Sequence, residues 1–309
     1  MKNNLWLLLK GIAMGAADII PGVSGGTIAF ITGIYEKLVF SLKSISDKEN
    51  LSLLFKLKII DFWKNINGNF LLLVFGGILI SVFSLSKLIT FLLDEYPMFV
   101  WAYFFGLILA SIWHILKNSA KPNVTNITIF IIFSVLAFYL TSLPPMNMGS
   151  GLLNTFLAGT IAICAMILPG ISGSFILLIL GQYRNILKAV NELDILTLIV
   201  FTLGTVVGLV LFSKFLSWLL KKYKDATVYA LSGFMLGALN KVWPWKITLS
   251  WFVDRHGHRH PLLQENLLPS SFAEKSGMSP QIEYVLLFFA LGIITILVFE
   301  LATKKKSEK

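Results

Sequence analysis

A glycine-rich helix breaker carrying hydroxyl side chains occurs twice in an otherwise apolar sequence. The first copy contains Pro21, Gly22, Ser24, Gly25, Gly26 and Thr27, and the second contains Pro169, Gly170, Ser172, Gly173 and Ser174. Free backbone N–H groups, hydroxyls and the positive end of a helix dipole together suit a phosphate or a carboxylate. The two copies therefore predict an anion site. The alternative is a pair of packing turns whose glycines only let helices approach closely.

The two copies belong to a longer internal repeat. At a shift of 148 residues, ten of the nineteen positions in 17–35 are identical to those in 165–183. Further along, a shift of 127 residues aligns Gly77 with Gly204 and Tyr96 with Tyr223. Duplicated breakers within hydrophobic segments are typical of transporters, whose binding site lies between the two repeats.

Ionisable residues in apolar surroundings are the next functional candidates. Asp18 precedes the first breaker, and its counterpart in the repeat is Met166. Such an acid can couple a proton or a cation, cover the site, or cap a helix. Glu36 and Arg184 occupy equivalent places with opposite charge. They can form a bridge or a gate between the halves, or extend to the membrane interface.

Two lysines, Lys87 and Lys214, also coincide in the repeat. If they face inward, each supplies a cation for an anionic headgroup. If they face lipid, their long side chains reach the interface instead.

Composition requires a membrane protein. The 309 residues are 56% hydrophobic and 14% charged, with a formal net charge of +10, whereas soluble domains carry about 25% charged residues. Because the basic residues lie between hydrophobic segments, the positive charge indicates membrane orientation and anionic lipid rather than nucleic acid. We expect neither a cofactor nor a metal ion.

The hydrophobic segments divide into two similar sets around a linker at 144–150. The first repeat, 1–143, is expected to hold a re-entrant hairpin at 4–40, a basic segment on the membrane surface at 41–69, and spans at 70–93, 98–116 and 127–143. The second repeat, 151–303, is expected to hold a hairpin at 152–186, spans at 195–220, 227–242 and 284–302, and a polar outer loop at 243–280.

Segment length favours the hairpins over single kinked spans. The apolar piece before the first breaker has about fourteen residues and reaches about 21 Å, whereas the hydrocarbon core is about 30 Å thick. A hairpin adds no net crossing, so each half crosses three times and the second half inserts upside down. The fold class predicted is therefore an all-α polytopic membrane protein with an inverted-topology repeat.

Charge counts give the orientation. The side holding both termini would carry 17 lysines and arginines and the opposite side 7, and positive loops stay in the cytoplasm. Both termini are therefore expected inside.

Two other chemistries are weaker alternatives. Gly22-Val23-Ser24-Gly25-Gly26 fits the G-x-S-x-G pattern of hydrolases, but that elbow needs a preceding strand, and His114 is the one histidine inside a predicted span. His256, His258 and His260 alternate in the outer loop, where Arg255 and Arg259 disfavour a metal ion. A solvated loop or contact with a lipid headgroup suits them better.

Residues 14–27 and 169–173, together with Asp254-Arg255-His256-Gly257 and Pro261-Leu262-Leu263-Gln264, resemble the signatures of a known family. It is the bacterial polyprenyl-phosphate (PopT-like) transporter family, formerly a domain of unknown function. The second motif ends in Ser174-Phe175 where the first has Gly26-Thr27.

The resemblance implies a transporter of the bacterial cytoplasmic membrane rather than an enzyme. It would return undecaprenyl phosphate, the lipid carrier of cell-wall synthesis, from the outer to the inner leaflet, with a proton or sodium ion as a candidate coupling ion. The two breakers would hold phosphate with Lys87, Arg184 or Lys214, while Asp18 or Glu36 would act in coupling or gating. A small-anion or ion-coupled carrier of the same architecture is the alternative.

Overall fold

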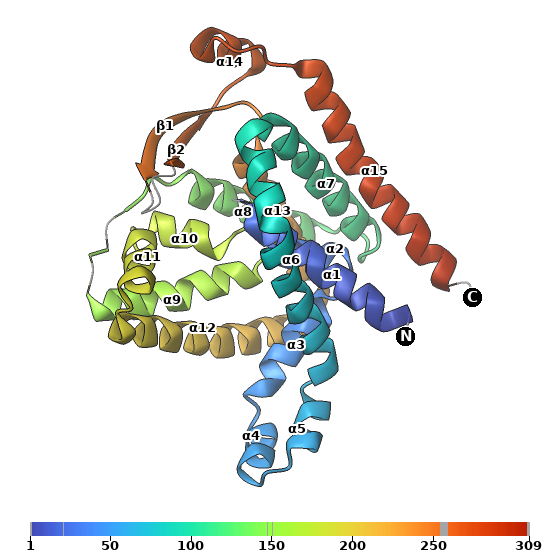
Figure 1. Cartoon of the computed structure of the whole chain (residues 1–309). Coiled ribbons are helices and arrows are strands. Elements are labelled where there is room, and N and C mark those ends of the chain that lie inside the picture. Colours follow the sequence, from blue (N-terminus) through green and yellow to red (C-terminus); the bar gives the residue numbers. More distant parts are fainter. Residues whose placement is uncertain (1, 21, 147, 150, 254–258, 308–309) are drawn as a thin grey trace.

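The computed structural model describes residues 2–20, 22–146, 148–149, 151–253 and 259–307 (Figure 1). The first half consists of α1 (Lys2–Ile19), α2 (Gly25–Ile31), α3 (Tyr35–Ile45), α4 (Lys48–Phe55), α5 (Ile59–Asn65), α6 (Gly68–Glu95), α7 (Pro97–Lys117) and α8 (Val124–Ser142). The second half consists of α9 (Leu152–Ile167), α10 (Gly173–Ile179), α11 (Tyr183–Glu192), α12 (Ile195–Lys222), α13 (Lys224–Ala238), the 3-10 turn η1 (Leu239–Val242), β1 (Lys246–Val253), β2 (Arg259–Asn266), α14 (Pro269–Ser276) and α15 (Ile282–Ser307).

Helix bounds in the two halves coincide at the shifts found in the sequence. The seven-residue helices α2 and α10 begin 148 residues apart, and the 28-residue helices α6 and α12 begin 127 residues apart. Backbone conformation coincides as well, since φ is +83° at Gly22 and +95° at Gly170. Glycine adopts this left-handed region without steric cost. Both breakers therefore use their glycine for the same turn.

Close helix packing follows the same register. In the first half α1 packs along α6, and in the second half α9 packs along α12. The backbone of α6 at Val74 leaves no room for a Cβ on Gly11, and the backbone of α12 at Phe201 leaves none on the equivalent Gly159. Small residues at these contacts let the helix backbones touch, as is common between membrane helices.

The last helix of each half packs on the middle helix of the other half. Helix α8 lies along α13, and α15 lies along α7. Gly233 of α13 fits against the Phe130 carbonyl, and Gly106 of α7 fits against the Phe289 carbonyl. The two halves are thus interlocked through two equivalent helix pairs.

Five helices in the described part of the chain are long and apolar enough to cross a membrane, namely α6, α7, α8, α12 and residues Ile282–Leu301 of α15. The remaining predicted span, 227–242, forms the 15-residue helix α13 followed by η1. It is shorter than the roughly 20 residues that a straight crossing needs.

The outer segment 243–280 is more ordered than the polar loop expected there. Strands β1 and β2 form an antiparallel pair in which Lys246 lies opposite Asn266, and α14 follows. The indole N–H of Trp243 donates to the Leu267 carbonyl oxygen at 2.8 Å, which ties the base of this pair to the bundle. A small sheet is therefore added to the predicted all-α fold. Residues 254–258, with His256 and His258, lie outside the described residues.

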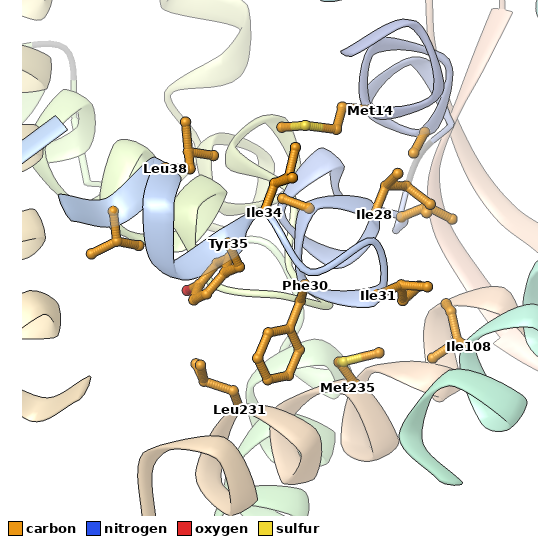
Figure 2. Packing of buried hydrophobic residues seen from close by; sticks show 14 of the residues in the cluster. Met14, Ile28, Phe30, Ile31, Ile34, Tyr35, Leu38, Ile108, Leu231 and Met235 are labelled. Atoms are coloured by element: carbon orange, nitrogen blue, oxygen red, sulfur yellow. The ribbon is translucent and has the colours of Figure 1, made fainter. Parts of the chain in front are cut away.

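The largest hydrophobic cluster surrounds α2 (Figure 2). Phe30 of α2 points toward Leu231 and Met235 of α13, and Ile31 lies near Ile108 of α7. All seven residues of α2 are buried. A helix this short is not stable alone in water, so its position is fixed by the surrounding helices. The helix at the end of the first breaker therefore lies inside the core of the molecule.

The basic segment between α3 and α6 forms α4 and α5, which extend away from the bundle (Figure 1). Phe55, Leu57 and Ile60 are exposed at its tip, interleaved with Lys56 and Lys58. Apolar and basic side chains together suit an anionic lipid surface, and a location on the membrane surface stays a prediction for this segment.

Candidate functional site

The two breaker loops touch each other. The Ser24 hydroxyl donates to the Met166 carbonyl oxygen at 3.3 Å. From the other side, the Gly170 N–H donates to the Thr27 hydroxyl oxygen at 2.8 Å. Ser24 and Thr27 are both fully buried. The structure thus brings the two copies of the motif together, with two of the predicted hydroxyls joining the loops.

A third hydrogen bond supports this junction. The buried Tyr35 hydroxyl, at the start of α3, donates to the Ile167 carbonyl oxygen at 3.1 Å. Gly26 lies against the same carbonyl, since a Cβ there would be 2.9 Å from the Ile167 oxygen. The start of α2 and the start of α3 are therefore fitted closely onto the end of α9.

The side chain of Asp18, a residue of α1, lies at the N-terminus of α2. The Gly25 N–H donates to the Asp18 Oδ1 atom at 2.7 Å, and the Gly26 N–H donates to the Ser24 hydroxyl oxygen at 3.1 Å. An anion at a helix N-terminus is stabilised by the free N–H groups and by the helix dipole. The first loop thus carries the predicted anion chemistry, but the anion is the protein's own carboxylate acting as a cap.

The second loop has the same backbone and different side chains. Ser172 caps α10 by accepting the Phe175 N–H at 3.2 Å, and its oxygen lies 3.3 Å from that of Ser174. Ser174 is exposed. Met166 stands where the first loop has Asp18. The start of α10 therefore receives no carboxylate from this position.

A lysine that sequence reasoning missed touches both loops. Lys241 lies in η1, and a Cβ on Gly22 would be 2.8 Å from the Lys241 Cβ. Its ammonium lies 4.4 Å from the centre of the Phe175 ring, in the second loop. Lys246 donates to the Lys241 carbonyl oxygen and lies 4.1 Å over the ring of Trp101. Two cations thus stand beside the loop junction, each over an aromatic face.

The environment of Lys246 disfavours its charge. Burial and the neighbouring charge of Lys241 lower the pKa of Lys246 to about 7. A phosphate nearby would reverse this shift by favouring the ammonium form. The sequence did contain a signal for this region, because at the shift of 127 Lys241 coincides with His114. The charge count assigns Lys241 and Lys246 to the outer side and therefore does not identify them as site residues.

The cations predicted from the sequence lie elsewhere. Lys87 on α6 and Lys214 on α12 are exposed, and within the described residues neither forms an ion pair or hydrogen bond with a breaker loop. Arg184 is exposed at the start of α11.

Glu36 forms an ion pair with Lys224, 2.7 Å away at the start of α13. Pro21 lies outside the described residues, whereas Pro169 is fully buried.

A cavity of about 560 Å³ opens beside α2 and α3. Its walls include Gly33, Tyr35, Glu36, Lys37 and Asn67. Because Tyr35 also bonds the end of α9, the cavity reaches the residue that supports the loop junction. The cavity wall therefore carries side chains of both charges, Glu36 and Lys37.

The geometry gives no support to hydrolase or metal chemistry. Ser24 follows a helix and a turn, so it lacks the preceding strand of a nucleophile elbow. Nδ1 of His114 lies 3.1 Å from Oε2 of Glu300, away from Ser24. Among the described residues, no three His, Cys, Asp or Glu side chains are grouped to hold a metal ion.

Comparison with known proteins assigns the family. Residues 14–260 match a family model described as undecaprenyl phosphate translocase-like. The chain is 46% identical over 297 residues to a polyprenyl-phosphate transporter of Vibrio cholerae, covering 94% of this chain and 95% of that protein. It is 32% identical to a polyprenyl-phosphate transporter of Staphylococcus aureus, covering 82% and 92%. No solved structure matches. The chain therefore belongs to the undecaprenyl phosphate translocase-like family of bacterial membrane transporters, which are not enzymes.

Proposed function

We propose that this chain moves undecaprenyl phosphate from the outer to the inner leaflet of the bacterial cytoplasmic membrane, and that the phosphate binds where the two loops meet Lys241 and Lys246. Both relatives, from Vibrio cholerae and Staphylococcus aureus, are polyprenyl-phosphate transporters. The observation that carries the site is Lys241, whose side chain contacts Gly22 in one loop and Phe175 in the other.

The chemistry of this place suits the substrate. A phosphomonoester carries a charge of about −1.5 to −2 at neutral pH and accepts several strong hydrogen bonds. The negative charge would be stabilised by two ammonium groups, a loop hydroxyl and loop N–H groups, while the long apolar tail remains in lipid. The loop residues proposed to line the path are Pro21, Gly22, Ser24, Gly25, Gly26, Thr27, Pro169, Gly170, Ser172, Gly173 and Ser174.

The proposed architecture is an inverted-topology repeat with two re-entrant hairpins. Its support is the coincidence of helix bounds at two fixed shifts, together with equivalent helix pairs in both halves. Non-helical backbone at membrane depth is tolerated only where it is buried in protein or lines a cavity, and the buried loop junction meets that condition. The 17 basic residues on the side of the termini support a cytoplasmic location for both termini.

Alternating access would expose the loop junction to each leaflet in turn. Lys87, Lys214 and Arg184, which are exposed here, would meet a headgroup only when the two halves have moved. The Glu36–Lys224 pair joins α3 to the start of α13 beside the 560 Å³ cavity. It is the proposed gate on the cytoplasmic side.

The test follows the headgroup of a polyprenyl phosphate in vesicles containing the purified full-length protein. A membrane-impermeant phosphatase added outside reports which headgroups have changed leaflet. A hydrogen bond to a charged group is worth about 1.5–3 kcal/mol, so we expect Lys241→Gln to slow translocation by about 30-fold. Lys275→Gln, an exposed lysine on α14, is the matched control. Translocation at the wild-type rate by Lys241→Gln would exclude the proposed site.

Competition separates this function from a carrier of small anions. If the apolar tail is recognised together with the headgroup, soluble phosphate at millimolar concentration should leave lipid translocation unchanged. Strong inhibition by soluble phosphate would favour the small-anion carrier. Potassium chloride at the same ionic strength shows whether added salt alone weakens transport.

A further inference from the structure

The 560 Å³ cavity beside α2 and α3 combines charged and apolar walls. Glu36, Lys37 and Asn67 line it together with the aromatic rings of Phe30 and Phe40. Pockets of this size hold small molecules, and the space is larger than a free phosphate ion fills. The walls therefore suit a ligand that joins a polar head to an apolar chain.

Two lysines stand at this wall over aromatic rings. The ammonium of Lys37 lies 4.8 Å from the centre of the buried Phe70 ring on α6. The ammonium of Lys221, at the end of α12, lies 5.4 Å from the centre of the Phe40 ring, which is part of the wall. Within the described part of the chain, neither lysine forms an ion pair with an acid. Both cations can therefore turn from an aromatic face to an incoming anion.

A third lysine is paired with an acid of the wall. Lys224 lies 2.7 Å from Glu36, and the two side chains are 59% and 40% exposed. An ion pair that is open to solvent contributes little to stability. A phosphate dianion can therefore replace Glu36 as the partner of Lys224.

The cavity shares a residue with the loop junction. Tyr35 lines the cavity, and its hydroxyl donates to the carbonyl oxygen of Ile167 at 3.1 Å. The ring of Tyr35 also packs edge-on against that of Phe30 in the buried helix α2, with 5.1 Å between the ring centres. The cavity and the junction are therefore adjacent, because both include Tyr35.

The repeat places opposite charges at the equivalent turns of the two halves. At the shift of 127, Lys221 and Lys222 at the end of α12 correspond to Asp94 and Glu95 at the end of α6. All four side chains are exposed. An anion is therefore attracted at the end of α12 and repelled at the end of α6. The cavity lies at the attractive turn.

Under the proposed topology the cavity opens toward the cytoplasm. Helix α3, which supplies much of the wall, packs against α12 and leads into the basic segment of α4 and α5 (Figure 1). These elements belong to the side that would carry 17 basic residues. The cavity therefore lies where a headgroup would enter the inner leaflet.

We propose that this cavity is a second phosphate site, which receives the phosphomonoester headgroup of a polyprenyl phosphate from the loop junction and releases it to the inner leaflet, an inference that rests on the proposed function. Lys37, Lys221 and Lys224 bind the phosphate, while the rings of the wall contact the first apolar units of the tail. An exit site has to bind its ligand weakly enough to release it, and repulsion by Glu36 serves that need. When the headgroup leaves, Glu36 pairs with Lys224 again.

The experiment measures how fast acetic anhydride acetylates Lys37 and Lys221 in the full-length protein in vesicles, by mass spectrometry of its peptides. A bound phosphate keeps a lysine charged and covers it, so acetylation slows. We expect polyprenyl phosphate to slow the reaction at least fivefold at both lysines and to leave Lys121, an exposed lysine between α7 and α8, unchanged. Polyprenol, which has the same tail without the phosphate, should protect neither lysine, and nor should inorganic phosphate at the same concentration.

Substitutions show whether the lysines act together. Lys37→Gln should raise by about tenfold the polyprenyl phosphate concentration that protects Lys221, because one partner of the phosphate is lost. Lys121→Gln removes the same charge from the same side and should leave that concentration within about twofold of wild type. Lys37 is exposed, so its substitution leaves the core intact. If size exclusion nevertheless shows misfolding, Lys221→Gln with acetylation measured at Lys37 gives the same test.

Equal acetylation of Lys37 and Lys221 with and without polyprenyl phosphate would overturn the second site. Equal protection by polyprenol would overturn it too, because the tail alone would then explain the effect. Protection by inorganic phosphate as strong as that by the lipid would exclude the lipid headgroup as the ligand. Failure of the proposed function would look different, since wild-type vesicles would then show no protein-dependent translocation, whatever the acetylation of Lys37.

Discussion

The two breaker loops share one backbone and differ in charge. In the first, Asp18 caps α2, and every residue of that helix is buried. In the second, Met166 replaces the acid, Ser174 is exposed, and only Leu177 and Ile179 of the seven residues of α10 are buried. In the first loop the helix N-terminus is therefore buried and already occupied by a carboxylate, whereas the second loop retains an accessible hydroxyl.

The difference shows how a duplicated element can divide its work. An internal carboxylate and a phosphate repel each other and compete for the same N–H groups. The first loop would then act mainly as a support, held by Ser24 and Thr27 against the second. The second loop, beside Lys241, would receive the headgroup. Four measurements test this division, from the largest expected effect to the smallest.

Placing an acid in the second loop should produce the largest effect. Met166 is 41% exposed, so Met166→Asp can be accommodated and would give the second loop the carboxylate of the first. Repulsion of a nearby phosphate at an effective dielectric of about 20 amounts to about 2 kcal/mol or more. We expect affinity for polyprenyl phosphate to fall about 30-fold in a vesicle binding assay. Met166→Asn, without the charge, is the control, and equal affinities for the two variants would contradict the division.

Breaking the junction between the loops should lower stability. Thr27→Val preserves shape but removes the acceptor of the Gly170 N–H, a buried donor. A buried group left without its partner costs about 1–3 kcal/mol. Thermal unfolding in detergent should show a lower midpoint for Thr27→Val, whereas Ser174→Ala in the exposed second loop should stay close to wild type. A larger loss for Ser174→Ala would reverse the roles assigned to the loops.

Removing the charge from the first loop should have a smaller effect, of opposite sign. Asp18→Asn keeps an oxygen that can accept the Gly25 N–H and removes the negative charge. With about 1 kcal/mol less repulsion at the junction, we expect headgroup affinity to rise about fivefold. Glu49→Gln, at an exposed position on α4, provides the comparison for a general loss of negative charge. Weaker binding by Asp18→Asn would show that the carboxylate assists the substrate instead.

Proton uptake should be the smallest signal. The pKa of Lys246 is lowered to about 7 by burial and by Lys241, so the empty protein loses this proton as the pH rises through 7. A bound phosphate raises that pKa again. Binding at pH 8 should therefore take up a fraction of one proton, measured by calorimetry in buffers of different ionisation enthalpy. Lys246→Gln should reduce the uptake, and uptake unchanged in that variant would place the titrating group elsewhere.

Much of the helical frame could be predicted from the sequence because it is encoded twice. The shifts of 148 and 127 that relate Gly22 to Gly170 and Gly77 to Gly204 also relate the helix bounds of the two halves. Breaker residues are local signals, so their turns needed no knowledge of tertiary contacts. The meeting of the two loops followed from the repeat in the same way.

The cations at the junction could not be predicted in this manner. Lys241 and Lys246 follow α13, and their place beside the loops depends on how the outer segment folds back. The strands of that segment lack a counterpart in the first half, so the repeat carries no information about them. Lys87 and Lys214 matched each other in sequence, but the helix faces that hold them are exposed. Symmetry indicates equivalence between residues, and packing alone decides which of them approach a ligand.

Because the last helix of each half packs on the other half, the first half cannot complete its packing before the second half has been synthesised. Helix α8 can pack on α13 only after much of the second half has been synthesised. Helix α7 can pack on α15 only after α15, the final helix of the chain, has been synthesised. Until then the glycine face of α7 at Gly106 has no partner backbone. The first half is thus an obligate intermediate of membrane insertion, and two fragments divided near the linker would have to assemble together to yield a working protein.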